Sequence, residues 1–255
     1  MKSIKNFLLK NLFKLNLKFF SRVSSKINIH KLKYELYSQA NKEIKSLYKI
    51  FNKYQRSSNI ESINSKYFNK SNQWIKNYSR IENLIQYFSI FKFVVSNLKK
   101  KKEIHVLDYG SFFCFGSIIL NQIVNSNIDA IDLYDEKDVR KFISCIRKSK
   151  NIRYTNISKL DKFKLSKKDL IIMYDVLDSL KLNKNEKIYD YFDNLIKFFY
   201  RNLRGQGKLV ISTFETSTKI KLIEIIKILS KNNFNKIELF FNFDGKRFVI
   251  FASMN

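Results

Sequence analysis

The sequence predicts an α/β protein with an open, mostly parallel sheet of seven strands, an antiparallel last strand and a helical region in front. From residue 104 onward, short runs rich in β-branched residues alternate with longer amphipathic stretches, as strands and helices do around a parallel sheet. The last two apolar runs are joined by Asp244-Gly245, a strong signal for an antiparallel hairpin. Before residue 104 the apolar residues repeat at helical spacing. We therefore expect a helical N-terminal region over residues 1–103 and an α/β domain over residues 104–255.

Each expected element of the α/β domain corresponds to one of these runs or stretches. Strands are predicted at residues 104–108, 128–133, 152–156, 169–174, 208–213, 236–243 and 247–252. Helices are predicted near residues 116–126, 136–148, 186–204 and 217–232. With the strands numbered in chain order, we expect the sheet order 3-2-1-4-5-7-6, with the last strand antiparallel to the rest.

The N-terminal region is expected to contain two helices and a basic leading segment. Apolar residues at helical spacing predict helices over residues 31–54 and 73–98, with a Ser- and Asn-rich loop over 57–72. The first 34 residues contain no Asp or Glu and have apolar residues at helical spacing: Ile4, Leu8, Leu12, Leu15 and Phe19. Three interpretations fit this segment: a mitochondrial presequence, an amphipathic helix on an anionic membrane, or an ordinary helix docked on its own domain.

The charge of the chain is strongly basic, with 49 Lys and Arg against 22 Asp and Glu and a formal net charge of +27. Such a charge favours a nucleic-acid or anionic-membrane partner. However, proline is absent, only five glycines occur, and residues with AT-rich codons abound, which is typical of an AT-rich genome. Apart from a run at residues 99–102, the lysines spread along the whole chain. Mutational drift on a solvated surface therefore explains the excess charge equally well.

Cysteine and histidine are too scarce for a disulfide framework or a zinc site. The two cysteines, Cys114 and Cys145, fit a reducing compartment, and His30 and His105 lie far apart in the sequence, so no metal site is expected. No apolar run reaches the ~18 residues of a transmembrane helix, so the chain is not expected to span a membrane. We expect a cytoplasmic protein, with a mitochondrial location or a peripheral position on a membrane surface as alternatives.

The first predicted strand and the turn after it form the strongest candidate for a ligand site. In open α/β sheets, ligands bind at the carboxyl ends of strands, where the strand order reverses. The first strand ends at Asp108, and Gly110 and Gly116 follow it closely in a chain with only five glycines. Glycine lets the backbone approach a ligand closely, and a carboxylate at the strand end would orient a polar group of that ligand.

Several motifs in this domain resemble those of class I S-adenosylmethionine-dependent methyltransferases. The segment VLDYG, with Asp108 and Gly110, resembles motif I of that family, usually VLDxGxGxG. IDAIDLYDE resembles the second strand, whose terminal acid binds the cofactor ribose, and this role maps onto Asp132, 24 residues after Asp108. KDLIIMYDVLDSL and FFYRNLRGQGKLVIST resemble the fourth strand with its loop and the fifth strand with its Gly turn. The resemblance covers about 150 residues and implies the Rossmann-like methyltransferase fold, with S-adenosylmethionine as cofactor.

The chain departs from the family in its glycines. The two later glycines of motif I are replaced by Phe112 and Cys114, and bulk there would narrow the methionine or ribose pocket. Either glycine is scarce for reasons of codon bias, or cofactor binding has been lost. Gly116 is either a shifted glycine or the start of the helix. Gly205 and Gly207 are expected to make the turn before strand 208–213.

The resemblance implies roles for five residues. Asp108, Gly110 and Asp132 would hold the cofactor. Tyr174 would line the adenine or substrate pocket, and Asp175 would accept the proton of the methyl acceptor. Alternatively, the first two acids are capping or turn carboxylates of a domain that binds no cofactor, Tyr174 is a core residue, and Asp175 and Asp178 are solvated loop acids.

The leading hypothesis is methyl transfer to oxygen or nitrogen of a small or medium acceptor, a saccharide or a glycolipid among them, with the helical region capping the site. The absence of proline excludes the Asn/Asp-Pro-Pro-Tyr signature of base N-methyltransferases. The alternative is a catalytically inactive methyltransferase-like domain that binds RNA or a (mito)ribosomal assembly through its lysines. A third hypothesis is a membrane-surface enzyme that acts on a glycolipid and contacts the membrane through its basic N-terminal helix.

Overall fold

The chain is described by a computed structural model at residues 27–31, 45–46, 48–49, 66, 81–98, 102–144, 151–158, 165–177, 187–214, 220–241 and 247–254. Several predicted features lie outside these residues: the apolar repeat at residues 4–19, most of the helix at 31–54, Cys145, Asp178 and the turn Asp244-Gly245. These features stay predictions.

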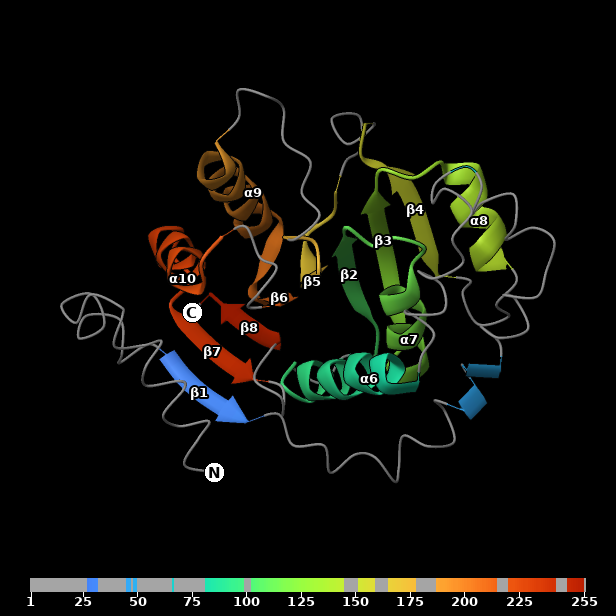
Figure 1. The fold of residues 1–255 in the computed structure, drawn as a ribbon, viewed down its shortest axis with the longest axis horizontal. Coiled ribbons are helices and arrows are strands. Elements are labelled where there is room, and N and C mark those ends of the chain that lie inside the picture. Colours follow the sequence, from blue (N-terminus) through green and yellow to red (C-terminus); the bar gives the residue numbers. More distant parts are fainter. Residues whose placement is uncertain are drawn as a thin grey trace. The chain divides into compact units, whose positions relative to one another are not determined.

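Residues 33–165 form one of two compact units, and residues 1–32 together with 166–255 form the other. The first unit contains three parallel strands in the order β4-β3-β2 (Figure 1). They are β2 (Ile104–Tyr109), β3 (Ser126–Asp132) and β4 (Ile152–Asn156). Among the described helices of this unit are α6 (Ile81–Ser96), α7 (Phe115–Ile123) and α8 (Glu136–Ser144), and residues 45–46, 48–49 and 66 are helical as well.

The core of this unit explains the continuous apolar run of β2. Val106 and Leu107 point to opposite faces of the strand and are both fully buried, so both faces of β2 are covered. Helix α6 packs against α7, and Gly116 lies at their contact. A Cβ on Gly116 would come within 3.4 Å of the Phe91 ring and 3.6 Å of the Tyr87 ring. Gly116 is the second residue of α7 and lies against α6 at ordinary packing distance, rather than forming part of the turn.

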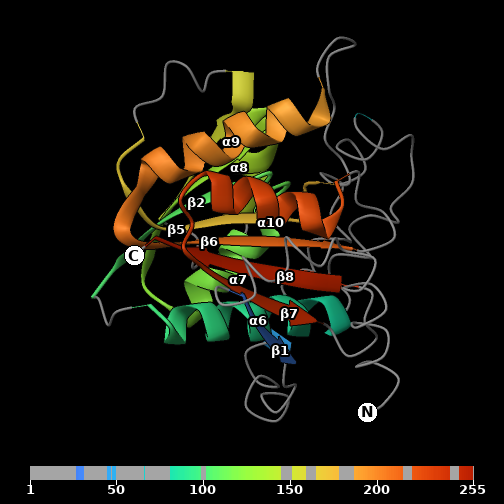
Figure 2. The same cartoon turned by 90° about the vertical axis from the view of Figure 1, so that its left-hand side faces the viewer.

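The second unit contains five strands in the order β5-β6-β8-β7-β1. In chain order they are β1 (Ile27–Lys31), β5 (Lys168–Tyr174), β6 (Leu203–Phe214), β7 (Lys236–Phe241) and β8 (Arg247–Ser253). The helices are α9 (Ile188–Asn202) and α10 (Leu222–Lys231), which pack together over one face of β6, β7 and β8 (Figure 2).

The expected α/β fold is confirmed. All seven predicted strands are present, and within each unit their order agrees with the predicted 3-2-1 and 4-5-7-6. Strand β8 runs antiparallel to both β6 and β7, so the predicted terminal hairpin is present. The parallel strands point their carboxyl ends to one edge within each unit. The predicted site residues lie at the ends of β2, β3 and β5 and directly after β2 and β5.

The expectation of a purely helical N-terminal region is wrong for residues 27–31. They form β1, which pairs in parallel with β7, Ile27 opposite Ile237 and Ile29 opposite Leu239. The backbone hydrogen-bond partners of this strand come from the far end of the sequence. Because the strand is stabilised by backbone hydrogen bonds to a distant segment, its conformation does not follow the helical spacing of the apolar residues around it.

The turn predicted at Gly205 and Gly207 is also wrong in form, because both glycines lie inside β6. The pairing of β5 with β6 shifts from Lys168 opposite Leu203 to Leu170 opposite Lys208, which makes a bulge of the intervening residues. A Cβ on Gly207 would lie 2.9 Å from the carbonyl oxygen of Lys168, so only glycine fits there.

Candidate functional site

The loop after β2 is attached by its backbone to the end of β3. The amides of Gly110 and Ser111 both donate to the carbonyl oxygen of Ile131, at 2.8 and 3.1 Å. Gly110 has a φ of 71°, in the left-handed region that favours glycine. The sharp turn that the sequence predicted after Asp108 is therefore present, and it brings the loop beside Asp132.

All three motif I glycine positions have left-handed backbone, although only one of them is glycine. Phe112 has a φ of 53° and Cys114 a φ of 61°. Such values cost a residue with a Cβ about 1–2 kcal/mol, and they persist only where neighbouring contacts hold them. The loop thus keeps the backbone path of a glycine-rich motif after two of its glycines have been replaced.

Hydrogen bonds hold Cys114 in this conformation. Its amide donates to the carbonyl oxygen of Ser111 at 2.8 Å, and its own carbonyl accepts from the amide of Ile118 at 2.9 Å, at the start of α7. The thiol is fully buried, and burial raises its pKa well above the usual range. Cys114 is therefore a structural residue with an unreactive thiol.

Phe112 is held at both its backbone and its ring. Its amide donates to Oδ2 of Asp132 at 2.6 Å. The half-buried ring contacts three others: Phe113 edge-on at 5.1 Å, Tyr134 edge-on at 5.2 Å and Phe115 stacked at 6.3 Å between centroids. The ring that the sequence placed in or beside the pocket thus belongs to a cluster of aromatic side chains.

Asp132 ends β3 and is half-buried. Its Oδ2 accepts from the Phe112 amide and its Oδ1 accepts from the amide of Leu133, each at 2.6 Å. Burial raises the pKa of its carboxyl, and the two amide hydrogen bonds oppose that rise. Each carboxylate oxygen can accept a second hydrogen bond, so the group still has acceptor capacity for a ligand.

Asp108 is 4% exposed and faces α7. Its Oδ2 accepts a hydrogen bond of 2.5 Å from the Ser117 hydroxyl. Burial raises the pKa of this carboxyl to about 6, with repulsion from Asp132 adding to the rise and the Ser117 hydrogen bond opposing it. Asp108 therefore ties the end of β2 to α7, and its charge changes near neutral pH.

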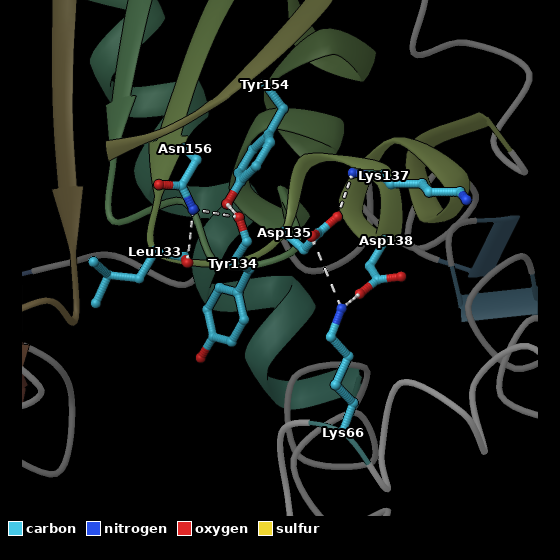
Figure 3. A network of polar contacts seen from close by, with 8 residues as sticks. All are labelled: Lys66, Leu133, Tyr134, Asp135, Lys137, Asp138, Tyr154 and Asn156. Atoms are coloured by element: carbon cyan, nitrogen blue, oxygen red, sulfur yellow. Dashed lines mark hydrogen bonds and ion pairs between the residues drawn. The ribbon is translucent and has the colours of Figure 1, made fainter. Parts of the chain in front are cut away.

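Two side chains of β4 fix the loop that follows Asp132 (Figure 3). The amide nitrogen Nδ2 of Asn156 donates to the carbonyl oxygens of Leu133 and Tyr134, at 2.8 and 2.9 Å. The Tyr154 hydroxyl donates to the same Tyr134 carbonyl at 2.9 Å. The Leu133 side chain is left 59% exposed, an apolar surface directly beside the carboxylate.

Sequence reasoning missed these partners. The only signal for Asn156 is its position at the end of a predicted strand, where ligand-side residues gather. Leu133 directly follows the acid that was assigned to the ribose. No local pattern marks Tyr154 or Ser117, because their partners belong to other elements.

A residue of the N-terminal region also reaches this loop. The Lys66 Nζ lies 2.8 Å from Oδ2 of Asp138 and 3.9 Å from a carboxylate oxygen of Asp135 (Figure 3). All three side chains belong to the unit of residues 33–165. The loop prediction for residues 57–72 is wrong at Lys66, which is helical, and Lys66 contacts both Asp135 in the loop after Asp132 and Asp138 in the first turn of α8.

The other two predicted site residues belong to the second unit. Tyr174 is the last residue of β5 and is 8% exposed. Asp175 follows it with a φ of 56°, and its amide donates to the carbonyl oxygen of Ser212 at 2.8 Å. The Ser212 hydroxyl lies 3.5 Å from Oδ1 of Asp175. The structure thus brings Asp108, Gly110 and Asp132 together in one unit and Tyr174 and Asp175 together in the other.

Neither a metal site nor a membrane span emerges from the described residues. They bring no three His, Cys, Asp or Glu side chains together in a group that would hold a metal ion. None of the described helices is long and apolar enough to cross a bilayer.

Solved methyltransferases share this fold, whereas no protein-family model and no curated protein matches the sequence. Magnesium protoporphyrin IX methyltransferase from Synechocystis PCC 6803, solved with bound S-adenosylmethionine, is 16% identical, with a TM-score of 0.55 over 82% of this chain and 97% of that one. A protein assigned as an O-methyltransferase from Nostoc punctiforme is 12% identical, with a TM-score of 0.51 over 68% of this chain and 61% of that one. The CurJ carbon methyltransferase is also 12% identical, with a TM-score of 0.52 over 69% and 56%. The chain thus spans less than two thirds of the length of the last two. These likenesses show the Rossmann-like methyltransferase fold.

Proposed function

We propose that the protein binds S-adenosylmethionine at the loops after β2 and β3 and transfers its methyl group to a small or medium acceptor. The observation that supports this most is the left-handed backbone at residues 110, 112 and 114, at the three glycine positions of motif I. A chain that had lost cofactor binding would have no reason to keep strained backbone at two non-glycine residues.

The chemistry of the loop fits this cofactor. The Asp132 carboxylate has acceptor capacity for ribose hydroxyls, and each such hydrogen bond contributes about 1.5–3 kcal/mol. The exposed Leu133 side chain offers an apolar surface to the adenine. Gly110 allows a close approach of the backbone, and the Asp108 carboxyl would orient the amino-acid part of the cofactor.

The cofactor supplies a methyl group activated by a sulfonium, so the protein mainly has to position it. In this proposal Asp132 binds the ribose, and Asn156 and Tyr154 hold the loop that carries Leu133. Tyr174 would line the adenine or substrate pocket. Asp175 would accept the acceptor's proton, and the Ser212 hydroxyl beside it would orient the carboxylate.

We further propose that residues 1–103 cap the site and select the acceptor. The contacts of Lys66 with Asp135 and Asp138 support a link between this region and the loop after Asp132 together with the start of α8. Saccharides and glycolipids are the acceptor classes to test first, and the basic N-terminal segment would favour an acceptor in an anionic membrane.

Calorimetry with S-adenosylmethionine and S-adenosylhomocysteine tests the proposed function directly. We expect saturable binding of both, and transfer of a labelled methyl group to a saccharide or to a glycolipid in vesicles. Absence of binding at ligand concentrations of about 1 mM would overturn the proposal, because cofactor sites of this fold would otherwise be filled.

A further inference from the structure

Phe112 links the two loops that border the proposed cofactor site. It lies in the loop after β2, and it contacts both Asp132, the last residue of β3, and the loop that follows that strand. Its amide donates to Asp132 at 2.6 Å, and its ring meets the Tyr134 ring edge-on, with centroids 5.2 Å apart and planes at 82°. Tyr134 follows Asp132 by two positions.

Both contacts depend on the left-handed backbone of Phe112. This conformation directs the amide at the carboxylate while the side chain leaves the loop on the Tyr134 side. A glycine would adopt the same backbone at lower cost but would lack the ring. A ring pair in edge-to-face geometry stabilises beyond its buried area, and it thereby offsets part of the backbone strain.

We propose that Phe112 is a positioning residue of the cofactor site. Its ring, docked on Tyr134, keeps its amide on Asp132, so that the carboxylate is oriented before a ribose arrives. This inference rests on the proposed function and adds to it: the phenylalanine that stands in place of a motif glycine helps to hold the carboxylate that binds the cofactor. Because three neighbouring rings hold the Phe112 ring, it acts by holding Asp132 and not by obstructing the ligand.

Calorimetry with S-adenosylhomocysteine on the full chain tests the inference. Phe112→Ala is expected to weaken binding about three- to tenfold, the range of one aromatic pair. Phe112→Tyr keeps the ring and should bind within about twofold of the unmodified protein. Tyr134→Ala should weaken binding as much as Phe112→Ala, and the double variant should be no weaker than either single one, because both remove the same contact.

Tyr200→Ala is a matched control. Tyr200 is half-buried like Phe112, and its ring meets Phe234 edge-on at 5.6 Å and 82°, in the other unit of the chain. Its loss should lower the melting temperature about as much as Phe112→Ala does, with no change in S-adenosylhomocysteine affinity. A purely structural role for Phe112 would make the two variants alike in both measurements.

Unchanged binding in Phe112→Ala would overturn the inference and leave Phe112 a purely structural role, whereas tighter binding would overturn it and show that the ring obstructs the site. Should Phe112→Ala fail to fold, Tyr134→Ala tests the same contact from its other side. Hydrogen exchange of the Phe112 amide separates this inference from the proposed function, since it needs no ligand. Tyr134→Ala should speed that exchange at least fivefold or so, and an unchanged rate would overturn the inference. Absence of binding in the unmodified protein would count against the proposed function alone.

Discussion

The amide of Phe112 is bound to Oδ2 of Asp132 at 2.6 Å, which makes the proposed ribose carboxylate also the anchor of the loop after β2. Its other oxygen holds the amide of Leu133. The same side chain thus fixes both loops and keeps acceptor capacity for a ligand. Loss of Asp132 is expected to affect the site twice, by removing a ligand contact and by releasing the loop.

Asp132→Ala should weaken S-adenosylhomocysteine binding at least tenfold or so, because hydrogen bonds to a charged acceptor contribute about 1.5–3 kcal/mol each. Calorimetry measures the affinity, and circular dichroism checks that the variant is folded. Asp135→Ala is the control, since it removes from the same loop a carboxylate that contacts the amide of Lys137 and the ammonium group of Lys66. Equal affinity of a folded Asp132→Ala variant and the unmodified protein would show that the ribose role belongs elsewhere.

Glycine and alanine should exchange their usual order of stability at positions 112 and 114. Inside helices and strands, glycine is less stable than alanine, but in left-handed backbone the Cβ of alanine is strained. We expect Phe112→Gly to be more stable than Phe112→Ala, and Cys114→Gly more stable than Cys114→Ala, each by about 1 kcal/mol. Because each pair removes the same side chain, packing losses largely cancel.

Urea unfolding of the four variants measures this order. Gln122 in α7 provides the reference, since it has ordinary helical backbone and is half-buried. There Gln122→Gly should be less stable than Gln122→Ala by about 1 kcal/mol. The left-handed geometry of the loop would be refuted if alanine were the more stable residue at all three positions.

The sequence was sufficient to predict a sharp turn at the end of β2, but not to explain how that turn keeps its backbone without two of the motif glycines. Asp108, Gly110 and Asp132 were found from motif spacing, and the structure places them in one unit. The replacements at Phe112 and Cys114 indicated a damaged motif. The retained backbone of Phe112 depends on the Asp132 carboxylate and on an aromatic cluster from three separate elements, and that of Cys114 depends on hydrogen bonds with Ser111 and Ile118. Such contacts join residues from separate elements, so no periodic pattern in a single sequence predicts them.

Strand β1 and the bulge in β6 are two parts of the fold that local sequence patterns also could not predict. The residues of β1 have a local pattern that is too short to compete with the helical signal around them, and their partner β7 lies at the other end of the chain. In β6, Gly207 reads as a turn residue, yet it is required because the Lys168 carbonyl leaves no room for a Cβ. Strands whose signals are local and repeated, such as β4 and β5, were predicted almost to the residue.

RNA affinity tests whether the net charge of +27 has a binding role. Among the described lysines, five form ion pairs with carboxylates: Lys66, Lys197, Lys227, Lys231 and Lys236. We therefore expect weak RNA binding with a shallow salt dependence, measured on the full chain across a salt titration. A variant with glutamine at residues 99–102 should bind no differently. Tight binding that falls steeply with salt, in a protein without cofactor affinity, would instead favour the RNA-binding hypothesis.

Asp108 predicts how stability changes with pH. Burial raises the pKa of its carboxyl from 3.8 to about 6 in the folded protein, so the folded state binds its proton more tightly than the unfolded state does. Its stabilising contribution is therefore fully present below about pH 4 and is lost as the pH rises through about 6. By linkage, a shift of about two units corresponds to about 3 kcal/mol.

Asp108→Asn isolates this contribution, because asparagine does not titrate and its carbonyl oxygen can still accept the hydrogen bond from Ser117. The unfolding free energy of the variant minus that of the unmodified protein should rise by about 2.4 kcal/mol between pH 4 and pH 7.5. Comparing this stability difference at the two pH values cancels any effect of the substitution that does not depend on pH. Urea unfolding at both pH values is the measurement, and a difference that is the same at both would show that folding does not raise the pKa of Asp108.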